Sequence, residues 1–298
     1  MIHNLKNYLY RFISGTYQNI KRNRNKNKIL ATYKQKPRAK DLYISMTTYE
    51  PRLLVFEYAV LSILRGTILP EKILIYVPKG FKNLVLNNPN SFIKDELEYG
   101  LIQIIEMDED LGPHSKFFYS FKDFGSNKDI VICDDDVVYY KDWLKGLILA
   151  AESYPDFGVF AYKTVNVTVK GQEVLPYEDW IHLDSGNKPI NGLMYAEGVG
   201  GVLYRKGLLL KEVLNKDVFM DLLPKADDVW LWYCSYLNKV KIKHIKPISG
   251  IKLLFIIPGS QIVNLWTENT INKRNDKYVY DCRRYFIEEY DMDIIKFI

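Results

Sequence analysis

The chain has 298 residues, of which 48% are hydrophobic and 26% charged, with three cysteines and a net charge of +5. This length and apolar content support a folded core and exclude a chain that is disordered throughout. Three widely spaced cysteines exclude a disulfide framework or a cysteine-rich zinc site. Because the sequence has neither an apolar run of the ~18 residues that a membrane span needs nor a secretory signal pattern, we expect a cytoplasmic protein.

The positive charge is concentrated at the N-terminus. Residues 1–40 contain eleven Lys or Arg and no Asp or Glu, which leaves 30 basic and 36 acidic residues in 41–298. In the first twenty residues apolar side chains recur at helical spacing, and a polybasic run follows at Lys21–Lys28. The pattern predicts a basic, amphipathic arm that attaches the protein peripherally to the inner face of the cell membrane through anionic lipid. A solvated, partly disordered tail is the alternative interpretation.

Apolar strand-like runs alternate with helical patterns in the first half of the remaining chain. The predicted elements, in order, are a strand at Leu42–Met46, a helix after Pro51, strands at Ile73–Val77 and Leu101–Glu106, a helix at Ser115–Phe124, a strand at Asp129–Cys133 and a helix at Lys141–Ser153. This alternation predicts an α/β fold with a mostly parallel, Rossmann-like central sheet and helices on both faces. Ligands of such sheets bind beyond the carboxyl ends of the strands.

The second half is less regular. The pattern predicts two helices and five short strands there: helices at Ala226–Leu237 and Tyr278–Tyr290, and strands at Phe157–Tyr162, Val165–Val169, Val199–Tyr204, Val240–Ile245 and Leu253–Ile257. The sequence shows no internal repeat and no long linker after residue 41. We therefore expect one domain, over 41–298, after the N-terminal arm.

Three consecutive aspartates, Asp134, Asp135 and Asp136, directly follow the fourth predicted strand. Adjacent carboxylates at the end of a buried strand repel one another and are costly to desolvate, so a positive partner is expected. On an extended backbone Asp134 and Asp136 point the same way, and two parallel carboxylates can share Mg²⁺ or Mn²⁺. A solvated acidic turn is the alternative.

This strand with its D-x-D motif resembles the metal-binding motif of GT-A glycosyltransferases, which use nucleotide-sugar donors. Four further segments, in the expected order, resemble elements of bacterial family-2-like transferases of capsule or lipopolysaccharide synthesis: Tyr43–Arg52, Asp110–Lys116, Glu197–Tyr204 and Ala226–Leu231. The resemblance extends over about residues 41–245. It implies a GT-A fold, with a nucleotide-sugar-binding half at 41–140, an acceptor-binding half at 141–250 and a C-terminal extension at 251–298.

The resemblance also implies a reaction and its residues. A sugar would pass from a nucleoside diphosphate, with UDP expected, to a hydroxyl of a free or lipid-linked bacterial surface glycan. Asp136 with Asp134 would hold Mn²⁺ or Mg²⁺, and Asp228 would be the general base of an inverting transfer. The donor-binding residues implied are Thr47, Tyr49, Arg52, Asp110, Lys116, Asp134 and Asp135. The acceptor-binding residues implied are Gly200, Gly201, Asp227 and Trp230.

Several alternatives remain open at this point. Asp227 and Asp228 could simply cap a helix, and Asp227 stands where the family pattern usually has Glu. His244 could be a further metal ligand, although a lone histidine on a strand is more often structural. A retaining transferase, a non-catalytic nucleotide-sugar-binding protein and a nucleic-acid-binding protein are the alternative functions. The acidic body argues against nucleic acid as a partner.

Overall fold

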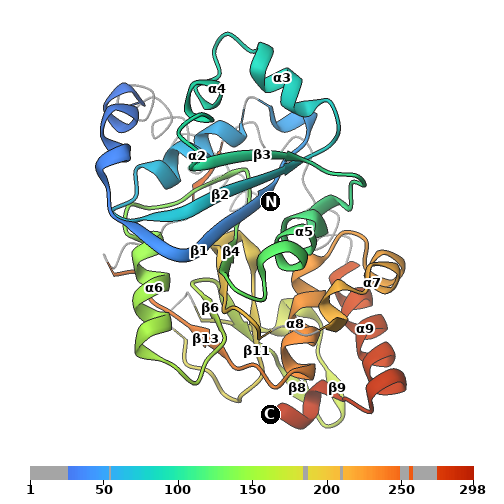
Figure 1. The fold of residues 1–298 in the computed structure, drawn as a ribbon. Coiled ribbons are helices and arrows are strands. Elements are labelled where there is room, and N and C mark those ends of the chain that lie inside the picture. The colour runs from blue at the N-terminus through green and yellow to red at the C-terminus, as the bar shows by residue number, and fades with distance from the viewer. Residues whose placement is uncertain (1–25, 54, 184–186, 209–210, 249–254, 258–273) are drawn as a thin grey trace, which may run out of the picture.

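A seven-stranded sheet lies at the centre of the molecule (Figure 1). The computed structural model describes residues 26–298 except 54, 184–186, 209–210, 249–254 and 258–273. The strand order is β13-β6-β12-β4-β1-β2-β3. The bounds are β1 Arg38–Thr47, β2 Leu69–Val77, β3 Ile102–Glu106, β4 Asp129–Ile132, β6 Val159–Ala161, β12 Val202–Tyr204 and β13 Ile242–His244. Every pairing in this sheet is parallel except those of β12 with β4 and β6, so the predicted α/β fold with a mostly parallel sheet is confirmed.

Helices cover both faces of this sheet, because successive side chains of a strand point to opposite faces and here both sets are apolar. On β1, Tyr43 belongs to a core that it shares with α5, α8 and α9, whereas Leu42 and Ile44 belong to a second core with α2 and α6. Figure 1 shows α6 and α8 on opposite sides of the lower strands. The helix bounds are α2 Phe56–Leu64, α3 Phe81–Asn87, α4 Ile93–Glu96, α5 Ser115–Phe124, α6 Trp143–Ser153, α7 Lys216–Leu222, α8 Asp227–Leu237 and α9 Arg274–Tyr290.

Three small antiparallel sheets complete the described fold. Their strands are β10 Ile181–His182, β7 Thr164–Asn166 and β11 Met194–Ala196; β5 Val137–Val138 and β14 Phe255–Ile256; and β8 Val169–Lys170 and β9 Glu173–Val174. After β11, a strand of the first of these sheets, the chain continues into a segment with Gly198, Gly200 and Gly201, called the glycine segment below, which precedes β12. The second continues the chain after the three aspartates, since β5 begins at Val137.

The described part of the N-terminal segment packs onto the domain. Residues 26–32 are helical, and Ile29 and Tyr33 are buried in the same core as α2. The Tyr33 hydroxyl donates to Glu96. Because β1 begins at Arg38, residues 26–40 belong to the folded domain rather than to an arm that ends at residue 40. The predicted amphipathic helix lies in residues 1–25, outside the described residues.

The predicted elements agree best with the structure where the hydrophobic pattern in the sequence is long. The helix predicted at Ser115–Phe124 has those bounds, while Lys141–Ser153 begins two residues later, at Trp143. The short helices α3 and α7 were not predicted. Among the described residues, no helix is both long enough and apolar enough to cross a membrane.

Candidate active site

The three aspartates lie beyond the carboxyl end of β4, as predicted. β4 pairs in parallel with β1, so the segment after β1 ends at the same edge of the sheet. That segment forms a short 3₁₀ helix, η2 (Glu50–Arg52). The first turn of α8, with Asp227 and Asp228, approaches the same place, because Lys116 contacts both Asp134 and Asp227. The fold thus gathers the charged residues of the predicted donor and acceptor sides at one edge, where parallel sheets bind ligands.

Arg52 forms the first of two charge clusters. Its Nη1 lies 2.6 Å from Asp136 Oδ2 and 3.6 Å from Asp135 Oδ1. The arginine and Asp135 are buried. Burial raises the pKa of Asp135 to about 7, and the nearby Arg52 charge opposes that rise. Arg52 is therefore the positive partner that the sequence required for two of the three aspartates.

Lys116 forms the second cluster, from the first turn of α5. Its Nζ lies 2.7 Å from Asp134 Oδ1 and 3.0 Å from Asp227 Oδ2, and the residue is only 6% exposed. Burial lowers the pKa of Lys116, but Asp134, Asp227 and Asp228 outweigh burial and hold the pKa well above its usual value. The lysine that was expected to bind phosphate thus has its ammonium between two carboxylates, Asp134 and Asp227, that are far apart in the sequence.

Asp228 lies beside these clusters, in the first turn of α8. Its Oδ2 accepts a hydrogen bond from the Gly198 N–H at 2.9 Å. Burial first, and then the neighbouring Asp227, raise the pKa of Asp228 well above its ordinary range, while Lys116 and the Gly198 N–H oppose that rise. A Cβ at position 198 would lie 2.6 Å from Asp228 Oδ1, so any larger residue there would displace the Asp228 carboxylate. A carboxylate with a raised pKa holds a proton more readily than an exposed aspartate does.

The glycine segment after Glu197 is held by packing against α6. It forms the 3₁₀ turn η5 (Gly198–Gly200), and Trp143 Nε1 donates to the Gly200 carbonyl at 2.8 Å. At Gly201, φ is +74° and an added Cβ would lie 2.3 Å from Trp143 Cζ2. Gly200 and Gly201 therefore pack against a buried indole, which gives them a structural role that the acceptor-binding interpretation did not include.

Trp230 differs from its predicted role. The residue is fully buried near the start of α8, and its Nε1 donates to the Val213 carbonyl at 3.0 Å. Its ring packs against Phe219 and Phe286. The residue is therefore a core side chain, and its ring faces cannot stack on an acceptor sugar.

The remaining donor-side candidates serve local structure. Thr47 Oγ1 donates to the Tyr76 carbonyl at 3.0 Å. The Tyr49 carbonyl accepts from the Arg52 N–H at 2.8 Å, and the tyrosine is half-buried. Asp110 is exposed, and its Oδ1 accepts from the Gly112 N–H at 2.9 Å. Of these three, Tyr49 lies nearest in the chain to the charge clusters, because it precedes η2.

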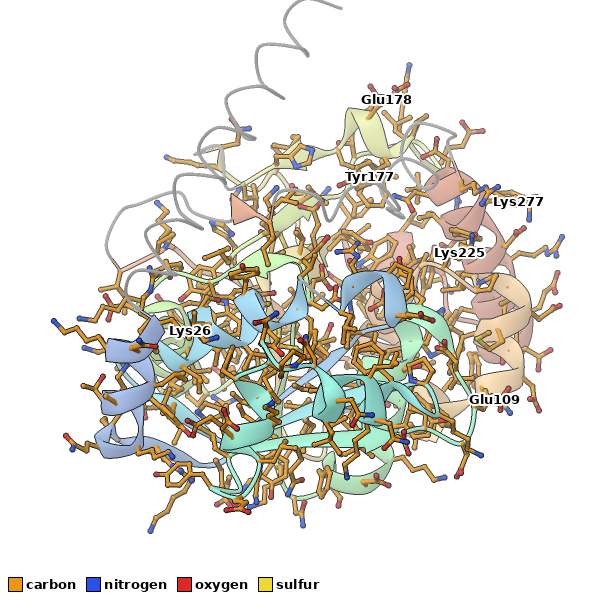
Figure 2. The ribbon with its side chains drawn as sticks, turned by 90° about the horizontal axis from the view of Figure 1, so that it is seen from above. Lys26, Glu109, Tyr177, Glu178, Lys225 and Lys277 are labelled. Carbon is orange, nitrogen blue, oxygen red and sulfur yellow. The ribbon has the colours of Figure 1, made fainter. Side chains whose placement is uncertain are left out.

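One group of residues near Asp228 was not predicted. The Tyr177 hydroxyl donates to Glu197, and Lys163 Nζ lies 3.9 Å from Glu197 Oε2. Glu197 could have been found, since it stands directly before the glycine whose N–H binds Asp228. Tyr177 had no signal in the sequence, because it lies in a short 3₁₀ helix, Tyr177–Asp179, within an irregular part of the chain. Figure 2 shows Tyr177 far from Lys26, the first described residue of the basic segment.

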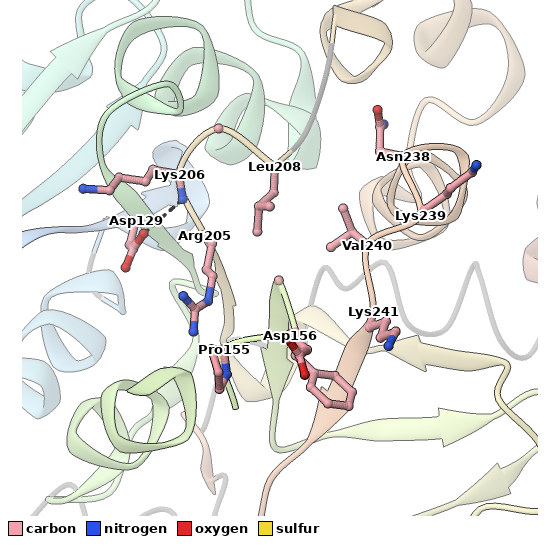
Figure 3. A pocket seen from close by; sticks show the side chains of 13 residues that line it. Asp129, Pro155, Asp156, Arg205, Lys206, Leu208, Asn238, Lys239, Val240 and Lys241 are labelled. Carbon is pink, nitrogen blue, oxygen red and sulfur yellow. Dashed lines mark hydrogen bonds between the residues drawn. The ribbon is translucent and has the colours of Figure 1, made fainter. Parts of the chain in front are cut away.

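A hollow of about 660 Å³ lies at the other edge of the sheet (Figure 3). Its lining includes Asp129, the first residue of β4, and Arg205, which follows β12. Figure 3 shows the side chains of Leu208 and Val240 next to the middle of the hollow. The side chains of Lys206 and Lys239 extend away from it. None of the aspartates of the two charge clusters lines the hollow, which is therefore separate from them.

Whether the site fits a divalent cation can be tested on its donor groups. Among the described residues, no three His, Cys, Asp or Glu side chains gather as a metal-binding group. The predicted candidate His244 instead has its Nδ1 2.8 Å from Thr164 Oγ1. Asp134 contacts Lys116, whereas Asp136 contacts Arg52 and lies in a turn, so the predicted parallel pair on an extended backbone is not observed. Mg²⁺ needs only one or two protein carboxylates when phosphates supply further oxygens, and either aspartate could supply one. The residues therefore fit a cation that binds together with a diphosphate.

The site also carries an excess of acidic groups. Within the described contacts, Arg52 and Lys116 are the basic partners of five aspartates, which are Asp134, Asp135, Asp136, Asp227 and Asp228. Carboxylates that outnumber the basic groups around them favour either bound protons or a bound cation. The charge balance is consistent with the donor-set argument for a divalent ion.

Comparisons with known proteins give only distant similarities. No family model matches the sequence, and no curated protein matches it. Among solved structures, TarS 1–349 from S. aureus, also solved with UDP, is 14% identical with a TM-score of 0.41, over 69% of this chain and 59% of that one. The mannosyltransferase PcManGT from Pyrobaculum calidifontis, solved with GDP-Man and Mn²⁺, is 15% identical with a TM-score of 0.42, over 79% and 65%.

A third similar structure, the 4-diphosphocytidyl-2C-methyl-D-erythritol synthase from Anaerococcus prevotii, is 14% identical with a TM-score of 0.36, over 72% of this chain and 92% of that one. The chain thus spans about three fifths of the TarS chain and somewhat less than two thirds of the PcManGT chain. These TM-scores all lie below 0.5, so the function proposed next is argued from the geometry of the site.

Proposed function

We propose that the protein is a metal-dependent GT-A-type glycosyltransferase. It transfers a sugar from a nucleoside diphosphate, with UDP as the expected carrier, to a hydroxyl of a bacterial surface glycan, with inversion at the anomeric carbon. The observation that carries the proposal is that two sets of aspartates, those after β4 and those at the start of α8, lie together at one edge of the sheet. The cluster after β4 would face the donor, and Asp228, a half-buried carboxylate at the start of α8 with a raised pKa, would face the acceptor.

Asp228 has the properties that a general base needs. Its raised pKa makes the carboxylate more basic than an exposed aspartate, and the Gly198 N–H fixes its orientation. In the proposed step the acceptor oxygen attacks the anomeric carbon while its proton passes to an Asp228 oxygen. The bond from the anomeric carbon to the donor phosphate oxygen breaks, and the nucleoside diphosphate leaves with the electron pair.

The other residues of the site orient the donor. Arg52 holds Asp135 and Asp136 in place, and Lys116 holds Asp134. Asp136, with Asp134, would hold Mn²⁺ or Mg²⁺, and such an ion supplies positive charge that stabilises a leaving diphosphate. Asp135, which lies between them in the chain, is a candidate for contact with the ribose. Thr47 and Tyr49 lie at the end of β1, where a nucleotide base would bind.

The residues around Asp228 indicate where the acceptor would bind, and the basic N-terminal segment indicates where in the cell the protein would act. Glu197 and Tyr177, beside the glycine segment, are candidate contacts for acceptor hydroxyls. The basic segment before β1 would hold the protein on the inner face of the membrane, next to a lipid-linked acceptor. Residues 26–40 belong to the folded domain, and their basic side chains Lys28, Lys34, Arg38 and Lys40 are exposed on its surface.

A donor panel tests the proposal directly. UDP-glucose, UDP-galactose, UDP-N-acetylglucosamine and GDP-mannose are each added with and without Mn²⁺, and thermal stabilisation and release of the free nucleotide are measured. We expect one donor to stabilise the protein and to be consumed only with the metal. The variant Asp136→Asn should lose both effects, whereas Asp156→Asn, at an exposed position of the other sheet edge, should keep them. Transfer by Asp136→Asn at the wild-type rate in EDTA would contradict the metal assignment.

Product stereochemistry tests the inverting course. Proton NMR of the transfer product gives the anomeric configuration of the new glycosidic bond, which does not mutarotate. A product with the configuration of the donor would assign Asp228 to acceptor positioning instead of proton transfer.

A further inference from the structure

Lys116 connects two parts of the site that are far apart in the sequence. It lies in the first turn of α5, and its ammonium lies within 3.0 Å of both Asp134, at the end of β4, and Asp227, in the first turn of α8. The backbone of Lys116 is itself anchored, because its carbonyl accepts from the hydroxyls of Ser45, on β1, and Ser120. The lysine is thus fixed to the sheet at its backbone and to α8 at its side chain.

The stability of a protein with a buried ion pair of this kind depends strongly on the presence of both partners. Removing one partner leaves the other as an unpaired buried charge, which is costly. Here a single ammonium serves two carboxylates, so its loss would leave Asp134 and Asp227 close together without compensation. Lys128 also contacts two carboxylates, with its Nζ 2.8 Å from Asp41 and 3.1 Å from Glu71. These contacts lie at the surface, since the Asp41 side chain is 60% exposed.

The position of Asp228 depends on this contact, because Asp227 and Asp228 are consecutive residues of one helical turn. If Asp227 is held by Lys116, the rotation of the first turn of α8 is fixed, and Asp228 is directed to the Gly198 N–H, from which it accepts at 2.9 Å. Small displacements of a reacting group reduce catalysis strongly. The contact between Lys116 and Asp227 therefore bears on the reaction without touching a substrate.

We propose that Lys116 is a positioning residue that ties the first turn of α8 to the end of β4 and thereby sets Asp228 relative to the donor-side aspartates. The proposal rests on the function proposed for Asp228 as the general base. It replaces the expectation that the Lys116 ammonium binds donor phosphates. Under the present proposal the ammonium stays between its two carboxylates during turnover.

Two variants of Lys116 and one matched control test the kinetic part. For Lys116→Met we expect kcat for release of the nucleotide to fall by roughly 10–100-fold, with the donor KM within about threefold of wild type. Lys116→Arg keeps the charge and should recover more of kcat than Lys116→Met does. Lys128→Met, at the surface pair, should leave both constants unchanged. A raised donor KM with an unchanged kcat would overturn the proposal and make Lys116 a donor ligand.

A double-mutant cycle in thermal unfolding tests the contact without any turnover. We expect Lys116→Met to lower the Tm by about 5–15 °C, because a buried pair is broken. Adding Asp227→Asn to this variant removes one of the uncompensated carboxylates and should raise the Tm again. Additive effects of the two substitutions would overturn the proposed tie. If the wild-type protein consumes no donor in the panel, the glycosyltransferase proposal fails, while the cycle still decides whether Lys116 fixes α8.

Discussion

Replacing Gly201 by Ala should destabilise the protein far more than a glycine-to-alanine change usually does. At φ +74° and ψ 130°, which lies outside the left-handed helical region, any residue with a Cβ is strained, at a cost on the order of 1–3 kcal/mol. The new Cβ would also lie 2.3 Å from Trp143 Cζ2, and overpacking of this kind costs roughly 1–3 kcal/mol. If Trp143 moves to relieve the clash, its bond to the Gly200 carbonyl is lost, and an unpaired buried donor costs about 1–3 kcal/mol.

The backbone strain together with either the clash or the lost hydrogen bond predicts a loss of roughly 2–6 kcal/mol in the free energy of unfolding. Gly171→Ala is the matched control, since φ is +63° there but nothing lies within 4 Å of the added Cβ. That variant should lose only the backbone contribution, about 1–2 kcal/mol. Urea unfolding followed by circular dichroism gives both values, if both variants unfold in two states. Equal losses in the two variants would refute the argument that Trp143 holds the glycine segment.

Three further predictions concern chemistry, pH and the N-terminus. Asp228→Asn should lower kcat on the order of 10²–10⁴-fold with donor affinity nearly unchanged; equal losses of both would make Asp228 a donor ligand. Burial lowers the pKa of His114 from 6.5 to about 4, so unfolding should become easier as the pH falls through this window, by up to roughly 3 kcal/mol. His114→Gln should flatten that dependence, and an unaltered pH profile of the unfolding free energy would contradict the assignment. Deleting residues 1–25 should release the protein from anionic liposomes at low salt while Ile29 and Tyr33 keep their packing; binding that ignores lipid charge would count against a membrane role.

The main elements of the fold could be predicted because their apolar patterns are long and locally complete. The run Ile130–Ile132 followed by three aspartates identified β4 and its polar end, and the spacing of Leu144, Leu147 and Ala151 identified α6. The short helix α7 has only two turns, which is too little for a periodic pattern to emerge. The direction of β12 could not be predicted either, because its apolar run reads the same in a parallel and in an antiparallel strand.

The candidate site could be predicted as a set of residues but not as a set of contacts. The three aspartates were identified by residue type and by their place after a strand, whereas Arg52 and Lys116 were implied by the resemblance to glycosyltransferase motifs. Their pairing depends on which loops the sheet brings together, and no local pattern encodes that. The prediction for Trp230 was wrong, because this aromatic residue next to a motif was expected to bind the acceptor, whereas its side chain is completely buried in the core.

The single antiparallel strand has a consequence for how the chain is made. Within the described sheet, β12 alone joins the pair β13 and β6 to the four strands β4, β1, β2 and β3, and it consists of three residues, Val202–Tyr204. During synthesis the outer edge of β4 stays unpaired until β12 emerges about 70 residues later, which at ribosomal speed takes roughly 4–14 s. Unpaired strand edges invite pairing with other chains. The nascent protein therefore passes through an interval in which its central sheet is open on one side, and a chain that stops before residue 202 cannot close it.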